Sequence, residues 1–375
     1  MKITSNFDSG NIECLSASSC DDIQLAIRKD AQSDFYQWFH FRLTGAQGET
    51  CVLKISNAGE SAYPGGWESY QAVASYDRET WFRVPTNYES GCLSILHTPE
   101  YDSVYYAYFA PYSLERHADL ISDCQFSSLA NLQVLGSTLD GRDIDMLTIG
   151  KPAKGKKTFW AIARQHPGES MAEWWMEGFL DRLLNEDDAS SRALLERATI
   201  CVVPNMNPDG SFRGHLRTNA VGSNLNREWL EPSLESSPEV FHVKNKMRET
   251  GVDFCFDVHG DEALPYNFIA GTEGVEKWND KRNAVLKNFK YMLAELNPDF
   301  QTKYGYPVNS SGKANLSLCS NNVAQSFDCL AMTLEMPFKD TANAPSPVFG
   351  WSPERAKLLG AACVHAMLAI EPQLW

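Results

Sequence analysis

The hydrophobic pattern of the chain changes near residue 125, and this change limits the possible folds more than any other feature. Beyond it, short apolar runs of strand length alternate with longer segments whose apolar residues recur at helical spacing. Strands that alternate with helices are typical of a parallel or mixed sheet with helices on both faces. For residues 126–375 we therefore expect an α/β fold with a mixed, mostly parallel sheet flanked by helices.

In this second part, four apolar runs have the length of buried strands: residues 158–163, 198–203, 254–258 and 330–334. A helix is expected over 171–184. Ser-Pro pairs predict the starts of two more helices, over 238–250 and 353–370. The sequence Asn-Pro-Asp-Gly at 207–210 predicts a turn after the second strand.

Residues 1–125 show a different pattern, in which apolar and aromatic residues alternate at period two between turn residues. The expected strands lie within residues 35–43, 51–55, 80–84, 92–96 and 104–109. Their spacing is typical of an antiparallel β-sandwich. We predict two domains, an N-terminal β-sandwich domain at 1–125 and a catalytic domain at 126–375, which suits a chain of 375 residues.

The composition disfavours several classes of partner. The net charge of −15 disfavours nucleic acid, because phosphate binding requires a basic surface. The chain has no run of about 18 apolar residues, so no membrane span is expected. Residues 1–10 lack the pattern of a signal peptide, and the ten cysteines occur singly, as reduced thiols do. We expect a cytoplasmic protein, and the sequence carries no signal for its oligomeric state.

Residues with useful chemistry follow three of the expected strands. His166 and Glu169 come after the first strand, His259 after the third and Glu335 after the fourth. In open α/β sheets, ligands bind at the carboxyl ends of the strands. These four side chains are therefore expected to meet at one edge of the sheet.

Two imidazoles and one carboxylate form a three-residue zinc set that leaves a fourth position open for water. We expect one Zn²⁺ per chain, held by His166, Glu169 and His259. Zinc polarises a carbonyl group and acidifies bound water. A second carboxylate must then carry a proton to the leaving group, and Glu335 is the candidate.

The segment 205–229 is rich in Asn and Gly and presents three arginines: Arg213, Arg217 and Arg227. A guanidinium group binds carboxylates and oxyanions through a planar fork of donors. The loop is therefore a candidate binding element for an anionic substrate group.

Taken together, these motifs resemble those of the cytosolic carboxypeptidase branch of the zinc metallocarboxypeptidases, and the ligand set is also that of carboxypeptidase A. His-Pro-Gly-Glu at 166–169 is similar to the zinc motif of that branch. Further matching segments occur in the same order: 204–210, 225–227, 259–260 and 333–335. The aromatic segments 36–39 and 105–112 resemble the β-sandwich domain that precedes the catalytic domain in this branch.

The resemblance implies a role for each matching residue. His166, Glu169 and His259 would bind zinc, and Glu335 would act as general base and acid. Arg217 would stabilise the oxyanion. Asn226 and Arg227 would bind the terminal carboxylate of the substrate, which would be the C-terminus of a peptide or protein.

Two features of the resemblance stay open. The family uses a mobile tyrosine over the site, and Tyr306 is preferred here to Tyr304. Members that remove glutamate have an arginine shortly after the glycine that matches Gly312, where this chain has Asn315 with Lys313 nearby. Lys313 and Asn315 are therefore candidate substrate-binding residues, and a preference for acidic terminal residues is undecided.

Two other functions are compatible with parts of the pattern. One is a zinc amidase or deacylase of N-acyl amino acids, and the other is a non-catalytic zinc-containing binding protein. The combination of Glu335, Arg217 and Arg227 favours an enzyme, because a binding protein has no need of a proton carrier.

Overall fold

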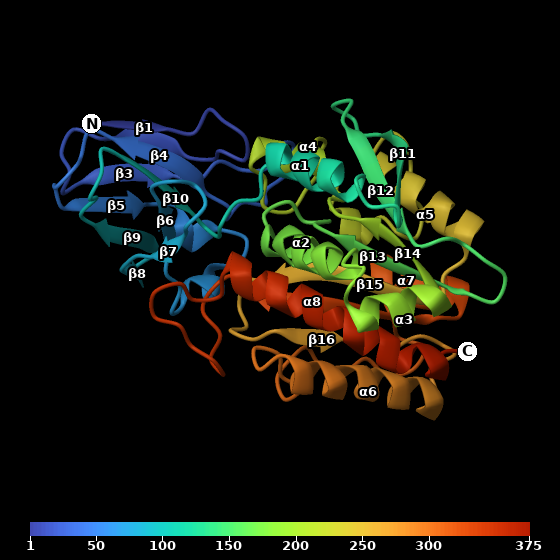
Figure 1. The fold of residues 1–375 in the computed structure, drawn as a ribbon. Helices are drawn as coiled ribbons and strands as arrows, with labels where there is room; N and C mark the ends of the chain where they lie inside the picture. The colour runs from blue at the N-terminus through green and yellow to red at the C-terminus, as the bar shows by residue number, and fades with distance from the viewer.

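The computed structural model describes all residues, 1–375, and shows two lobes side by side (Figure 1). The first lobe holds two five-stranded sheets. One has the order β1 (Lys2–Thr4), β4 (His40–Thr44), β10 (Ser103–Ala107), β6 (Val73–Ser75) and β7 (Phe82–Arg83). The other has the order β2 (Glu13–Ser16), β3 (Ile23–Ala26), β5 (Cys51–Ile55), β9 (Cys92–His97) and β8 (Thr86–Glu89).

The expected β-sandwich is confirmed, with one parallel pair, β3 and β5, among antiparallel neighbours. In β5, Cys51, Leu53 and Ile55 are buried while the residues between them are partly exposed. This alternation follows from the pleat, which sends successive side chains to opposite faces. The apolar faces of the two sheets belong to one hydrophobic core.

The strand expected over 35–43 begins only at His40. Residues 35–39 are irregular because polar groups there bond to a neighbouring loop. The Gln37 side-chain amide donates to Tyr63 O and accepts from Tyr63 N. Two further differences are the strand expected over 80–84, which is reduced to β7, and helix α1 (Leu114–Cys124), which was not predicted.

The second lobe contains a mixed seven-stranded sheet. Its order is β11 (Ala130–Ser137), β12 (Asp143–Ile149), β14 (Ala198–Val203), β13 (Lys157–Ala163), β15 (Phe254–Asp261), β17 (Leu330–Pro337) and β16 (Phe268–Ala270). The four strands β14, β13, β15 and β17 are parallel, and the strands at the edges are antiparallel. All four expected strands are confirmed, and β15 and β17 extend three residues beyond the expected ends.

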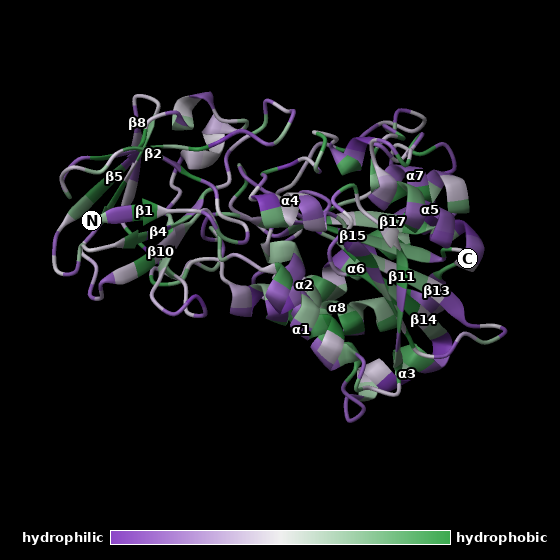
Figure 2. Cartoon of the chain, turned by 90° about the horizontal axis from the view of Figure 1, so that it is seen from above, coloured by the Kyte–Doolittle hydropathy of each residue, from purple (hydrophilic) through white to green (hydrophobic).

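Helices cover both faces of this sheet (Figure 1). The helices of the chain are α1 (Leu114–Cys124), α2 (Met171–Leu183), α3 (Ala189–Arg197), α4 (Pro208–Arg213), α5 (Pro238–Thr250), α6 (Asp280–Leu296), α7 (Cys319–Phe327) and α8 (Pro353–Ile370). In β13, Phe159 and Ala161 share a core with α2 and α8, whereas Trp160 and Ile162 share a core with α5 and α7. Figure 2 shows the hydrophobic strands enclosed between these layers.

The predicted turn at 207–210 instead opens a short helix, α4. The side chain of Asn207 accepts a hydrogen bond from Gly210 N, and Pro208 occupies the first helical position. Proline is favoured there because its missing N–H would have no partner in any case. The same residue types therefore serve a helix start as well as a turn.

The connections around β13 create the crevice that holds the site. The chain passes from β13 through α2 and α3 to β14 on one side, and from β14 through α5 to β15 on the other side of β13. The connection that leaves β15 runs instead to β17, in the opposite direction along the sheet, so the connections that leave β13 and β15 diverge at the carboxyl ends of these strands. Ligands bind at such a switch point in open α/β sheets.

The two lobes are joined by buried contacts. The guanidinium group of Arg83 donates to Phe338 O and Trp351 O at 2.9 and 3.0 Å. The rings of Tyr108 and Phe338 stack with centroids 4.3 Å apart. None of the helices is long and apolar enough to cross a membrane.

Candidate active site

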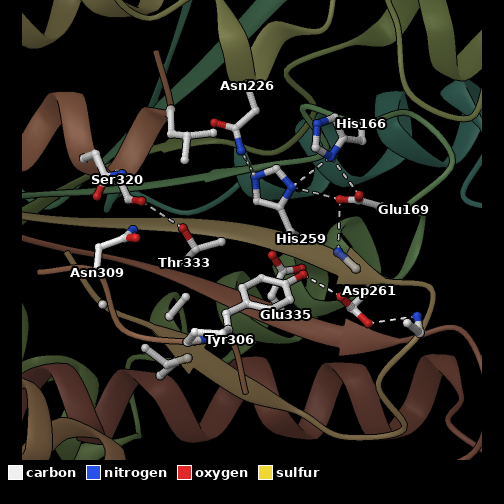
Figure 3. Close-up of a pocket in the computed structure, with 18 of the residues that line it drawn as sticks. His166, Glu169, Asn226, His259, Asp261, Tyr306, Asn309, Ser320, Thr333 and Glu335 are labelled. Carbon is white, nitrogen blue, oxygen red and sulfur yellow. Dashed lines mark hydrogen bonds and ion pairs between the residues drawn. The ribbon is translucent and has the colours of Figure 1, made fainter. Parts of the chain in front are cut away.

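The three expected metal ligands converge at the carboxyl ends of β13 and β15 (Figure 3). Nδ1 of His166 lies 2.7 Å from Oε1 of Glu169, and Nδ1 of His259 lies 2.9 Å from its Oε2. The two Nδ1 atoms are 3.2 Å apart. All three side chains are buried.

The outer nitrogens of the two imidazoles also have partners. Nε2 of His166 lies 3.0 Å from Oδ1 of Asn224, and Nε2 of His259 lies 3.0 Å from Oδ1 of Asp257. An imidazole whose Nε2–H is donated to an oxygen presents the lone pair of Nδ1 to a metal. Gln165 in turn donates to both oxygens of Asp257 at 2.9 Å.

This arrangement fits zinc. A tetrahedral site with bonds of about 2.0 Å has edges of about 3.3 Å, close to the separations of the three ligand atoms. Burial would raise the pKa of Glu169, but the two imidazoles and their hydrogen bonds hold it well below its ordinary value. Burial and the nearby Arg217 lower the pKa of His166 to about 4, which keeps the ring neutral at pH 7.

Glu335 lies beside this centre. It pairs with His259 in the register of the parallel strands β17 and β15. It is buried, and its Oε2 has no hydrogen-bond partner. Burial raises the pKa of Glu335 well above its ordinary value. A buried carboxyl group without a partner is costly to the fold, as expected of a group that exchanges protons.

The sequence placed His259 and Glu335 just after their strands, whereas both lie inside them. The ladder continues because the last residues of β15, Gly260 and Asp261, still pair with Met336 and Pro337. In the sequence, the polar residues His259 and Glu335 had suggested that each strand ends just before them.

Several other predicted residues line one cavity of about 500 Å³ with the metal ligands: Arg217, Asn226, Arg227 and Tyr306. Arg217 is flanked by the rings of Phe35 and Tyr63, whose centroids both lie 5.5 Å from its Cζ. Asn226 is fixed by its Oδ1, which accepts from Cys319 N at 2.8 Å.

Tyr306, and not Tyr304, lines the cavity. Its hydroxyl donates to Oδ2 of Asp261 (Figure 3). Burial and the nearby Glu335 raise the pKa of Tyr306 strongly, so the phenol stays protonated. Tyr304 stacks on Tyr266 with ring centroids 4.4 Å apart, and neither residue lines the cavity.

Lys313 and Asn315 do not line the cavity, contrary to the expectation from the sequence. Both are exposed on the loop before α7. Asn315 accepts from Ser317 N through its side chain, which fixes this loop. Gly312 has a φ of +72°, so the loop does not keep the regular alternation of faces on which the expectation depended.

The cavity also has lining residues that were not predicted from the sequence: Tyr63, Glu262, Glu273, Lys290, Ser320 and Thr333. Lys290 lies on α6, whose apolar residues alternate with charged ones and which was itself not predicted. Asp257 could have been found from its place two residues before His259 in an otherwise apolar strand.

Comparison with known proteins agrees with this site. Residues 3–109 match the cytosolic carboxypeptidase N-terminal domain, and residues 120–358 match the zinc carboxypeptidase family. A cytosolic carboxypeptidase from Caenorhabditis elegans is 26% identical over 89% of this chain and 78% of its own length.

Two solved structures are much more similar. One, from Shewanella denitrificans, is 55% identical with a TM-score of 0.99, and each chain is covered completely. The other is a metallocarboxypeptidase from Pseudomonas aeruginosa in complex with (2-guanidinoethylmercapto)succinic acid. It is 46% identical with a TM-score of 0.97, again over both whole chains. From these matches and its own geometry, the chain belongs to the zinc carboxypeptidase family and is a metallocarboxypeptidase with the N-terminal domain of the cytosolic carboxypeptidases.

Proposed function

We propose that this metallocarboxypeptidase uses one zinc ion, held by His166, Glu169 and His259, to remove the last residue of peptides or proteins. The observation that carries the proposal is the convergence of these ligands beside Glu335, whose Oε2 lacks a partner. When bound, zinc supplies Lewis acidity that polarises the scissile carbonyl and acidifies water.

The residues around the metal centre then have distinct tasks. Glu335 takes a proton from the attacking water and passes it to the leaving amine nitrogen. Arg217 donates to the carbonyl oxygen as negative charge develops there. Its side chain forms no ion pair with a carboxylate, so its donors are available to the substrate.

Asn226 and Arg227 bind the terminal carboxylate of the substrate. Both line the cavity, and Nη1 of Arg227 donates to the carbonyl oxygen of Asn226 at 2.6 Å. Guanidinium and amide donors on adjacent residues recognise the two oxygens of a carboxylate. Tyr306 lies across the cavity and limits its access to water.

The activity is tested with purified, zinc-loaded protein and matched peptides that end in a free carboxylate or an amide. We expect hydrolysis only of the free acid, and loss of turnover in Glu335→Gln with zinc retained. Equal cleavage of the amide would contradict the role of Asn226 and Arg227. Hydrolysis of N-acetylaspartate in place of peptides would support the deacylase alternative.

For the residue that is removed, we propose an acidic side chain that binds near Lys290. The ammonium group of Lys290 lines the cavity without an ion pair, and burial lowers its pKa. Glu273 lines the same region and is partly exposed. A desolvated cation gains more than a solvated carboxylate from an opposite charge, so the cavity favours an acidic residue.

Two variants distinguish a preference for acidic terminal residues from a preference for basic ones. Lys290→Met should lower kcat/KM for peptides ending in Glu about tenfold or more, with little effect on those ending in Leu. Glu273→Gln serves as the matched control and should raise kcat/KM for the same Glu-terminal peptides. If Glu273→Gln instead abolishes cleavage of peptides ending in Arg, the site prefers basic residues.

The inhibitor bound by the Pseudomonas aeruginosa relative provides a second probe, because it carries a guanidino group as well as a succinic acid. Inhibition that is weakened by Glu273→Gln and unaffected by Lys290→Met would place the guanidino group beside Glu273. That result would argue against the acidic preference.

The division into domains at 1–125 and 126–375 and a place in the cytoplasm remain proposals. Support for the division comes from the sheets, since β1 to β10 end at residue 107 and β11 begins at residue 130. The names of the cytosolic carboxypeptidase relatives agree with the proposed location.

A further inference from the structure

A turn of the first lobe, residues 30–35, lies against the loop that carries Arg217. The carboxylate of Asp30 accepts from the backbone N–H groups of Leu216, Arg217 and Thr218 at 2.7, 2.8 and 2.9 Å. It also accepts from the hydroxyl of Thr218 at 3.0 Å. Asp30 is only 3% exposed, so water does not compete for these donors.

The same turn contacts the side chain of Arg217. Phe35 closes the turn through a hydrogen bond from Asp30 N to Phe35 O, and its ring is one of the two that flank the guanidinium group. The other ring, Tyr63, also comes from the first lobe. Aromatic faces attract a guanidinium group and leave the N–H donors at its edge free.

The Arg217 loop is in turn bound to the metal centre. Gly168, between the ligands His166 and Glu169, donates through its backbone N–H to Leu216 O at 2.9 Å. A Cβ atom at Gly168 would lie 2.9 Å from that same oxygen, so only glycine permits the approach. One continuous set of contacts therefore runs from Asp30 through Leu216 to the zinc ligands.

We propose that Asp30 is a positioning residue of the reaction, which fixes the loop 216–218 so that the guanidinium group of Arg217 faces the scissile carbonyl. The first lobe thereby completes the active site of the second. The inference rests on the proposed role of Arg217 in stabilising the oxyanion. The alternative is that Asp30 only stabilises the contact between the two lobes and does not affect catalysis through Arg217.

The test uses Asp30→Asn, which keeps the shape of the side chain and replaces one acceptor oxygen with an NH₂ group. We expect kcat to fall about 10- to 100-fold, KM to change less than about threefold and zinc content to stay unchanged. Lys339→Met is the matched control, because it removes another contact between the lobes, to Glu68 O, and Lys339 makes no hydrogen bond to the loop 216–218. It should leave kcat unchanged.

Combining variants tests whether Asp30 acts through Arg217. In an Arg217→Ala background, Asp30→Asn should lower kcat by less than about twofold, because the group it positions is gone. If the two losses multiply, or if Asp30→Asn alone keeps the wild-type kcat, the inference is overturned. If Arg217→Ala alone keeps the wild-type kcat, the proposed role of Arg217 is wrong.

A second variant covers the case in which Asp30→Asn does not fold. Phe35→Leu removes one ring beside the guanidinium group and leaves the backbone contacts of the turn in place. It should lower kcat severalfold at unchanged KM, and this loss should also disappear in the Arg217→Ala background. A loss that persists there would count against positioning through Arg217.

Discussion

Nδ1 of His117 lies 2.6 Å from Oε1 of Glu173, across the buried contact between α1 and α2. Nε2 of the same ring lies 3.4 Å from Oδ2 of Asp145. The other oxygen of Glu173 accepts from Arg164 at 2.6 Å and from Asn205 at 3.1 Å. The carboxylate of Glu173 on α2 thus connects α1 with the segments that follow β13 and β14.

This contact predicts a loss of stability in alkali. Burial alone would lower the pKa of His117, but Glu173 and Asp145 outweigh it and raise the pKa to about 9. The unfolded chain has a value near 6.5, so the protonated ring stabilises the fold fully below about pH 6.5. The stabilisation is lost as the pH rises through about 9, by about 3 kcal/mol at most.

Urea unfolding of wild type and His117→Gln between pH 6 and pH 10 measures this contribution. The variant should be less stable at pH 6, and the difference should shrink toward pH 10. His365→Gln is the control, because its ring contacts the hydroxyl of Ser190 and no carboxylate. If the difference in the free energy of unfolding between wild type and His117→Gln stays constant with pH, the stabilisation does not come from protonation of His117.

Replacing Glu335 with Gln should stabilise the zinc-free protein while abolishing catalysis. The buried carboxyl group lacks a partner for Oε2, and a neutral amide avoids the cost of a buried charge. We expect the free energy of unfolding to rise by about 1 kcal/mol and kcat to fall about 1,000-fold or more. Glu295→Gln, at an exposed position on α6, should change neither.

Asp257→Asn should weaken zinc binding about 10- to 100-fold, because Asp257 orients His259 through its Nε2 atom. Competition with a chromophoric chelator measures the affinity. Asp253→Asn provides the control at the other end of β15, where the side chain accepts from Thr158 N. Equal zinc affinity in the two variants would show that the outer partner of His259 is dispensable.

Arg83→Met should destabilise the contact between the lobes by about 3 kcal/mol or more. The guanidinium group is buried and donates to four carbonyl groups: those of Gln71, Phe338, Phe349 and Trp351. Each carbonyl left without a partner costs about 1–3 kcal/mol. Arg42→Met, which loses one bond to Ser103, should cost less than about 1 kcal/mol. Denaturant unfolding compares them.

The strands of the second lobe could be predicted because parallel strands are buried on both faces and appear as continuous apolar runs. The run 198–203 matches β14 residue for residue. Helix α6 could not be recognised so easily, since its buried residues, such as Val285 and Phe289, are interrupted by lysines. Because this helix was not predicted, Lys290 was not recognised as a candidate site residue.

The residues of the candidate site likewise fall into those that could be predicted from the sequence and those that could not. His166, Glu169 and His259 could be predicted because they follow apolar strands whose carboxyl ends meet at one edge of the sheet. The motifs that contain them also resemble those of the family. The expectation for Lys313 and Asn315, which lie outside the cavity lining, depended on the path of one loop, and no local pattern determines that path. Asp30 was not predicted because its partners lie 186 to 188 residues further along the chain.

That separation has a consequence for synthesis of the protein. The turn at 30–35 leaves the ribosome long before the loop 216–218 exists, and Glu335 is translated later still. N-terminal domains generally fold first on a growing chain. The first lobe therefore folds before the loop that carries Arg217 has been synthesised. A nascent chain that ends before β17 lacks Glu335 and cannot contain a complete active site.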